Sequence, residues 1–280
     1  MSSETKLKII RVPVPSPTLW PYTTTNCYFI GNEHESILVD AGYDRPETKK
    51  ELEKAIKDHH LAIPKKIILT HSHPDHAPGV RQLSDWDPAV FCHTNGRKTI
   101  ETMIAPVKQL TTLADNVVIR IAGEPIRVLH VPGHSKDQIN LYLPSEQILI
   151  AGDNILSEGT TAIVHPDGNM NDYLASLTRL KELKLKKIGP GHGEWILNPY
   201  EHIQFIYQRR LDREKQILSL LKEHEKLTSA KLTEMIYQDT IHPSIFDVAE
   251  KTIDAHLEKL MNDELVQSED SVYSIKPAVT

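Results

Sequence analysis

The stretch LTHSHPDHAPG, residues 69–79, places three histidines and an aspartate within six positions, at His71, His73, Asp75 and His76. The chain has 15 histidines among 280 residues, so an accidental cluster is one explanation. Imidazole and carboxylate groups are also the side chains that bind zinc, iron and manganese. The apolar run KKIILT directly before the cluster indicates a short β-strand. The sequence therefore predicts a metal-binding loop where a strand ends.

Three further candidate ligands follow strand-like segments in the same way. His134 follows RVLHVP, Asp153 follows ILIAG, and His192 follows KKIGP. Loops at the carboxyl ends of strands converge at one edge of a sheet, where ligand sites gather. Together the groups supply five histidines and two aspartates, more than the three protein ligands that one catalytic zinc takes. We therefore expect two metal ions with an aspartate shared between them.

The second part of the chain has a different pattern from the first. Up to about residue 200, short strand-like and helix-like segments alternate, and the helix that starts near residue 171 has Asn171 or Asp172 as its expected N-cap. Beyond that point, three helical stretches precede a hairpin-like segment, 264–276, which together indicate a winged-helix-like unit. We expect a catalytic domain over residues 1–205 and a helical winged-helix-like domain over residues 206–280.

The composition sets limits on the cellular setting. Hydrophobic residues make up 39% of the chain and charged residues 25%, as in soluble globular proteins. The first ten residues, MSSETKLKII, hold no apolar signal segment, and no apolar run approaches the ~20 residues of a membrane span. Cys27 and Cys92 are expected to be free, buried thiols. These features predict a cytoplasmic protein with no membrane partner.

The order of these groups resembles that of the metallo-β-lactamase-fold hydrolases: H-x-H-x-D-H, then His134, Asp153 and His192, with Asp40 of ILVDAG matching a further position. The resemblance implies an α/β fold, a four-layer αββα sandwich with metals at one edge of its two sheets. It also implies a role for each ligand: the first metal would be held by His71, His73 and His134, and the second by Asp75, His76 and His192, with Asp153 bridging the two. Asp40 would orient the ligand loop through hydrogen bonds.

Two metals in such a site predict a hydrolytic reaction. Two ions ~3.5–4 Å apart share a water and lower its pKa toward ~7, which yields a metal-bridging hydroxide as nucleophile. Asp75 is the expected catalytic group that accepts a hydrogen bond from this hydroxide and aims it. We expect two zinc ions, with manganese or iron as alternatives. This chemistry suits thioesters, other esters and phosphodiesters, so the ligands alone leave the substrate open.

Several longer segments resemble the β-lactamase-like endoribonuclease family of mitochondria and its bacterial relatives. These are TTTNCYFIG, GDNILSEGTTAI, NDYLASLTRLKEL, GPGHGEWI and QRRLDREKQIL, followed by a winged-helix tail. The resemblance implies zinc-dependent cleavage of a phosphodiester substrate such as short single-stranded RNA. The alternative is a glyoxalase-type thioesterase or another hydrolase of small-molecule esters, because that group has the same seven ligand types.

The long helical stretch after residue 200 carries the candidate substrate-binding residues. Arg210 and Arg213 are three positions apart and share a helical face, which suits a carboxylate or phosphate; a solvated face is the alternative. Residues 201–280 hold 10 Lys and Arg against 15 Asp and Glu, a balance that disfavours free nucleic-acid binding by this region. The region is then expected to wall the cleft or to form a homodimer. A metal-dependent regulator without hydrolytic activity is a third hypothesis, which the complete ligand set disfavours.

Overall fold

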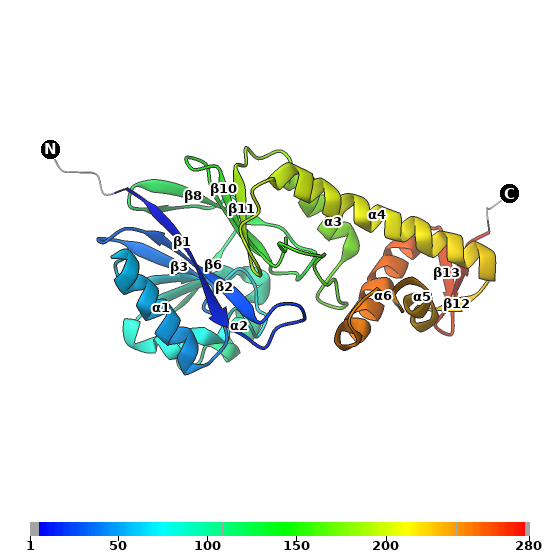
Figure 1. Cartoon of the computed structure of the whole chain (residues 1–280), viewed down its shortest axis with the longest axis horizontal. Helices are drawn as coiled ribbons and strands as arrows, with labels where there is room; N and C mark the ends of the chain where they lie inside the picture. The colour runs from blue at the N-terminus through cyan, green and yellow to red at the C-terminus, as the bar shows by residue number, and fades with distance from the viewer. Residues whose placement is uncertain (1–5, 108, 239, 278–280) are drawn as a thin grey trace.

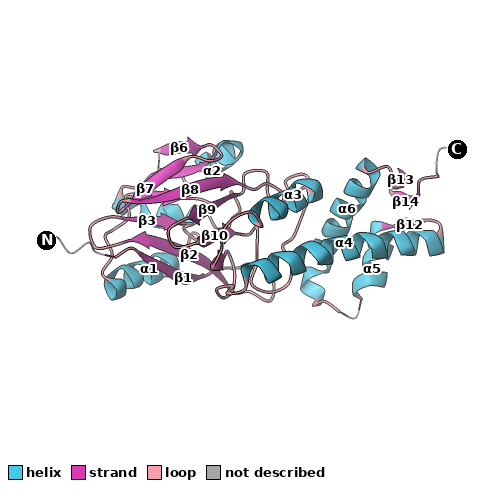
Figure 2. Ribbon diagram, turned by 90° about the horizontal axis from the view of Figure 1, so that it is seen from above, coloured by secondary structure: helices cyan, strands magenta, loops and turns pink. Residues whose placement is uncertain are grey.

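Two β-sheets packed face to face form the larger part of the protein (Figures 1 and 2). The computed structural model describes residues 6–107, 109–238 and 240–277. The first sheet has its six strands in sequence order: β1 (Lys8–Pro15), β2 (Thr24–Gly31), β3 (Ser36–Val39), β4 (Lys66–Ile68), β5 (Ala89–His93) and β6 (Leu110–Leu113). The second sheet has the order β11 (Lys187–Pro190), β10 (Ile148–Gly152), β9 (Ile139–Leu143), β8 (Glu124–His130) and β7 (Val118–Ile121).

The inner strands β3, β9 and β10 are buried along their whole length, because each sheet is covered on both sides, whereas the edge strands β1, β6 and β7 keep exposed positions. Along β2, Tyr28 and Ile30 pack between the two sheets, whereas Cys27 and Phe29 pack under the helices of the first sheet. This alternation follows from the two-residue period of a strand. The same inter-sheet layer takes Val128 and Leu141 of the second sheet. The sequences of the inner strands are therefore near-continuous hydrophobic runs, without the alternation of apolar and polar residues that a half-exposed strand shows.

Helices cover the outer face of each sheet. α1 (Pro46–His59) and the short α2 (Arg97–Met103) pack outside the first sheet, where Leu52 and Ile100 join its outer core. α3 (Met170–Leu180) and the first turns of α4 (Pro199–His224) pack outside the second sheet, through Leu177 and Ile203 among others. The layers are thus helix, sheet, sheet and helix, which confirms the predicted four-layer αββα sandwich.

The C-terminal region extends from the sandwich along α4 (Figure 1). The last turns of α4 pack through Ile217 and Leu221 against α5 (Ser229–Tyr237) and α6 (Phe246–Asn262). A small sheet completes the unit, in the order β12 (Leu227–Thr228), β14 (Val272–Ile275) and β13 (Val266–Glu269). Residue 205, the expected domain boundary, lies inside α4, so one helix contributes to both cores.

Some local expectations differ from the structure. The N-cap of α3 is Asn169, whose side chain accepts a hydrogen bond from the Asp172 amide at 3.0 Å, so the expectation of Asn171 or Asp172 was wrong. Cys27 and Cys92 are both buried and free. Within the described ranges, no helix is long and apolar enough to cross a membrane.

Candidate metal centre

All seven candidate ligands lie just beyond strand ends of the two sheets. The 71–76 loop follows β4, and His134 lies in the loop between β8 and β9. Asp153 follows β10 directly, and His192 follows β11, which pairs in parallel with β10. The chain thus brings residues separated by more than a hundred positions to one edge of the sandwich.

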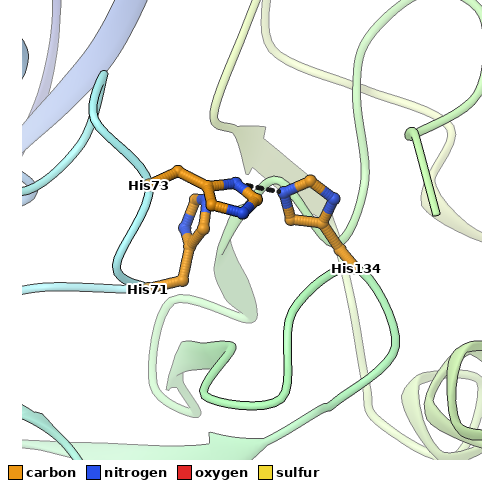
Figure 3. Close-up of side chains that lie close together, drawn as sticks. All are labelled: His71, His73 and His134. Atoms are coloured by element: carbon orange, nitrogen blue, oxygen red, sulfur yellow. Dashed lines mark hydrogen bonds between the residues drawn. The ribbon is translucent and has the colours of Figure 1, made fainter. Parts of the chain in front are cut away.

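The first group consists of three imidazoles that converge from two loops (Figure 3). His134 Nε2 lies 2.9 Å from His73 Nδ1. The ring of His71 lies 4.5 Å from that of His73 and 5.0 Å from that of His134, centre to centre. A nitrogen of each ring lies within 4.8 Å of a nitrogen of each of the others. This is an open, three-histidine donor set of the kind that catalytic zinc takes.

The second group joins two aspartates to two histidines: Asp75, His76, Asp153 and His192. Asp153 Oδ1 faces His76 Nε2 at 3.2 Å, and Asp153 Oδ2 faces His192 Nε2 at 3.3 Å. Asp75 Oδ2 also lies 3.3 Å from His192 Nε2. Asp153 reaches the first group as well, because its Oδ2 lies 3.8 Å from His134 Nε2. Its carboxylate therefore stands between the two donor sets.

Each of the five histidines is held from behind by its other ring nitrogen. Such support fixes the ring orientation and the tautomer, and it is usual for metal-binding histidines. A carbonyl oxygen can only accept, so the nitrogen facing it carries the hydrogen and leaves the opposite nitrogen free for a metal. The supports are the Thr70 hydroxyl for His71 (3.0 Å), the Ala162 carbonyl for His134 (2.8 Å), the Thr24 carbonyl for His192 (2.8 Å), the Asp40 carboxylate for His76 (2.8 Å) and the Asp167 carboxylate for His73 (3.5 Å).

Asp40 occupies the position expected of an orienting residue. It is buried, and its Oδ1 accepts from the Thr70 amide at 2.7 Å while its Oδ2 accepts from the Thr70 hydroxyl at 2.8 Å. Its Oδ2 also holds His76 Nδ1, as described above. One carboxylate thus ties the end of β3 to the start of the ligand loop, away from the open side of the donor sets.

Three buried polar atoms in the centre make no well-aligned hydrogen bond among the described residues: His71 Nε2, and the pair His76 Nε2 and Asp153 Oδ1, which face each other at 3.2 Å. Leaving such an atom unpaired costs about 1–3 kcal/mol, so native structures seldom keep several together. These atoms belong to the donor sets and point into them. Nitrogen and carboxylate donors in this arrangement fit divalent cations such as zinc, iron or manganese.

The protonation of the centre also suits metal binding. Burial lowers the pKa of His71 well below its usual range and that of His134 to about 4, so both rings are neutral at pH 7. Burial lowers the pKa of His192 too, but Asp153 and Asp75 outweigh it and raise that pKa to about 10. In the metal-free chain a proton on His192 thus balances the carboxylates. Cations would displace that proton and take over the balancing charge.

The two arginines expected to bind substrate have internal partners instead. Arg210 is only 4% exposed, and its guanidinium donates to the Thr161 carbonyl and lies over the Tyr173 ring at 5.3 Å. Arg213 lies over the Tyr237 ring at 4.2 Å and donates to Gln216. The two side chains share a helical face but contact different helices, because Tyr173 belongs to α3 and Tyr237 to α5. Arg210 is buried and Arg213 is half-buried. Neither contact is with the donor sets.

Other residues near the centre carried no signal in the sequence. Tyr22 stacks on the His192 ring at 5.3 Å between centres, and its hydroxyl donates to the Glu158 carbonyl. Two residues earlier, Trp20 is 53% exposed and stacks on His242 of the C-terminal region. Trp20 and Tyr22 belong to the loop between β1 and β2, so that loop lines the side of the centre next to His192.

Comparisons with known proteins agree with this geometry. A family model described as "Metallo-beta-lactamase superfamily" matches residues 20–192, and one described as "Beta-lactamase associated winged helix domain" matches residues 228–274. Proteins named Beta-lactamase-like protein 2 homolog are similar to this chain at 30% identity. The one from Caenorhabditis elegans covers 79% of this chain and 74% of its own length, and the one from Drosophila melanogaster covers 90% and 87%. An atrochrysone carboxyl ACP thioesterase of Aspergillus fumigatus is 27% identical, over 91% of this chain and 80% of its own.

Solved structures share the fold. A metallo-beta-lactamase family protein of Thermus thermophilus superposes with a TM-score of 0.81 at 24% identity, over 95% of this chain and 98% of its own. TTHA1623, described in a di-iron-bound form, is 28% identical with a TM-score of 0.54, over 67% of this chain and 96% of its own. The chain therefore belongs to the metallo-beta-lactamase superfamily, carries the winged-helix domain associated with it, and is a hydrolase of that superfamily.

Proposed function

We propose that the protein is a dinuclear metal hydrolase. His71, His73 and His134 would hold one cation, and Asp75, His76 and His192 the other, with Asp153 shared. The observation that carries this proposal is the placement of the Asp153 carboxylate, 3.3 Å from His192 and 3.8 Å from His134. Nitrogen and carboxylate donors suit zinc, which the sequence predicts, and also iron, which the similar TTHA1623 binds.

The residues around the centre support a hydrolytic role. When bound, two cations supply Lewis acidity and lower the pKa of a shared water toward ~7. Asp75 Oδ2 lies in the second donor set, 3.3 Å from His192 Nε2, and accepts a weak hydrogen bond from the Thr25 hydroxyl at 3.4 Å. His76 and His192 outweigh the effect of burial and hold the pKa of Asp75 below its usual range, so this group is an acceptor at neutral pH. We assign to Asp75 the orientation of the attacking water.

Acyl thioesters are the substrate class that we favour. A relative that aligns with 91% of this chain is named as a thioesterase, and two further such relatives align with 91% of it at 26–27% identity. The reacting group of a thioester carries no charge, so the chain's net charge of −6 does not oppose its approach. A polyanion would meet repulsion from the same charge. This choice reverses the order of the two substrate classes that the sequence alone favoured.

Short single-stranded RNA is the second candidate, and one observation favours it. Trp20 and Tyr22 bring two aromatic rings to the loop beside His192, and His242 adds a third from the C-terminal region. Bases stack on such rings with about 1–3 kcal/mol each and without regard to sequence. A short RNA end could be held there despite the unfavourable charge.

A substrate panel on defined metal forms tests both candidates. Metal-free protein would be loaded with zinc, iron(II) or manganese, and then given S-benzoyl and S-octanoyl N-acetylcysteamine, bis-p-nitrophenyl phosphate and end-labelled single-stranded RNA. We expect two metal equivalents per chain by plasma emission spectroscopy and hydrolysis of a thioester. Asp153→Asn is expected to lose metal and activity, whereas Asp44→Asn, which removes a carboxylate paired with Arg81 outside the centre, should keep both. Cleavage of RNA alone would select the second candidate, and binding of fewer than two metals would refute the dinuclear site.

A further inference from the structure

The segment Thr161–Ile163 connects both donor sets to the rest of the protein. The Thr161 hydroxyl donates to the Asp153 carbonyl oxygen at 2.5 Å. The next residue, Ala162, accepts from His134 Nδ1 through its carbonyl at 2.8 Å. Two consecutive residues therefore each hold one ligand: Thr161 holds the shared aspartate, Asp153, and Ala162 holds His134 of the first set. A displacement of this segment would move or release both ligands.

The C-terminal helices hold the same segment from its other side. Arg210 of α4 donates to the Thr161 carbonyl, and the Thr252 hydroxyl of α6 accepts from the Ile163 amide at 3.4 Å. Arg210 also lies over the Tyr173 ring, whose hydroxyl donates to the Asn154 carbonyl at 3.1 Å. The loop that begins at Asp153 is thus fastened by side chains of α3, α4 and α6.

Burying the charged side chain of Arg210 costs desolvation free energy, which argues that it does more than fill space. Its side chain is buried, and Arg210 Nε has no hydrogen-bond partner among the residues that the structure describes. The buried carboxylate of Glu214, one turn further along α4, lies 3.1 Å from Lys259 Nζ. A hydrophobic residue of similar size in such a place is often neutral or stabilising, because burying a charge carries a large desolvation cost. The guanidinium provides two interactions that an apolar side chain cannot: a donor to the Thr161 carbonyl and a cation over the Tyr173 ring.

We propose that Arg210 and Thr252 are positioning residues for the metal centre. They act through Thr161–Ile163 on Asp153 and His134, so that α4 and α6 set the spacing between the two donor sets. This inference rests on the proposed two-metal site and extends it, since it assigns a part of the centre's support to the winged-helix-associated helices. Residues that support metal ligands from behind typically change metal affinity by ~10–100-fold when they are removed.

The test measures metal binding directly, using the intact chain loaded with cobalt(II). Arg210→Met and Thr252→Val remove the two bonds to the segment, and Arg210→Lys keeps a donor at the same place. Two matched controls come from nearby. Arg213→Met changes an arginine of the same helix that contacts Tyr237, and Thr233→Val removes a buried hydroxyl of α5 that donates to the Ser229 carbonyl one turn before it. Chelator competition gives the dissociation constant, the visible cobalt spectrum reports ligand geometry, and thermal melting of the metal-free protein reports folding.

We expect Arg210→Met to weaken cobalt binding ~10–100-fold and to shift the visible spectrum. Thr252→Val should weaken it less, about threefold, because its 3.4 Å bond is long. Arg210→Lys should restore part of the affinity, and both controls should bind cobalt like the wild type. Should Arg210→Met fail to fold, Thr252→Val and Arg210→Lys decide the matter by the same readouts.

The result that overturns the inference is a wild-type dissociation constant and spectrum in Arg210→Met and Thr252→Val, whatever their melting temperatures. Such variants would mark both residues as ordinary contacts between helices and loop. That outcome leaves the proposed function intact, because the wild type still binds its metals. A wild type that takes up no cobalt would refute the proposed two-metal site itself, and the inference with it.

Discussion

Replacing Asp40 by asparagine isolates the contribution of one carboxylate to the second donor set. Asparagine has the same shape and tolerates the left-handed backbone of this position, where φ is 57°. Its oxygen can still accept from the Thr70 amide, but its NH₂ group would face His76 Nδ1, where the carboxylate now accepts at 2.8 Å. The Thr70 hydroxyl, which now donates to the same carboxylate oxygen at 2.8 Å, can rotate and accept from the NH₂ group instead. One buried, charge-assisted hydrogen bond, the one to His76, is thus lost and two donors are brought together. Such a bond contributes about 1.5–3 kcal/mol.

At 1.4 kcal/mol per factor of ten, that loss corresponds to a metal affinity lowered ~10–100-fold. We expect the loss in one of two steps when zinc binding is followed by chelator competition, since His76 belongs to one donor set. Asp44→Asn serves as the control, because Asp44 contacts Arg81 and Gln82 away from the centre. Two unchanged dissociation constants in Asp40→Asn would mean that His76 keeps its orientation without the carboxylate, and would refute the reasoning.

Three further outcomes are expected. His73→Ala should lose most activity and bound metal by plasma emission spectroscopy, while His93→Ala, outside the centre, should keep both; normal metal content in the first variant would contradict its role as a ligand. Gly191→Ala would place a Cβ 2.0 Å from Asp153 Oδ1, so we expect reduced metal content in a folded protein, and full content would show that the carboxylate can shift freely. Burial lowers the pKa of His256 to about 4, so the unfolded chain takes up a proton below pH ~6.5 that the folded chain refuses. The free energy of unfolding should then fall by up to ~1.4 kcal/mol per pH unit as the pH drops from ~6.5 toward 4, and urea midpoints of His256→Gln should depend less on pH over that range.

The sequence located the donor sets because their positions follow from strand ends. His134, Asp153 and His192 each stand directly after an apolar run, and parallel or neighbouring strands bring such positions to one edge. Asp40 was predicted on another ground, the resemblance of ILVDAG to a position of the metallo-β-lactamase-fold hydrolases. The groups that hold the histidine rings from behind could not be predicted from the sequence. Ala162 and Thr24 act through backbone carbonyls, which every residue type provides. Only the folded chain shows which carbonyl faces which ring.

The sequence also could not predict which elements pack against a given face of a helix. Spacing predicts that Arg210 and Arg213 share a face of α4, and it gives no information about what covers that face. Tertiary packing of α3 and α6 buries Arg210 against Tyr173 and turns it toward Thr161. The strand β1 has only a weak strand pattern in the sequence, because its eight residues, KIIRVPVP, include two prolines, which suit an edge strand.

The length of α4 has a consequence for how the protein can be divided. At 1.5 Å per residue its 26 residues form a rod of ~39 Å, with Ile203 and Ile206 in one core and Ile217 and Leu221 in the other. A cut after residue 205 would sever this rod and separate Ile206 from the core that it shares with Ile203 and α3. Shuffling of the winged-helix unit between homologues would therefore succeed only at a seam beyond Arg210, and chimeras joined earlier should be recovered as aggregates.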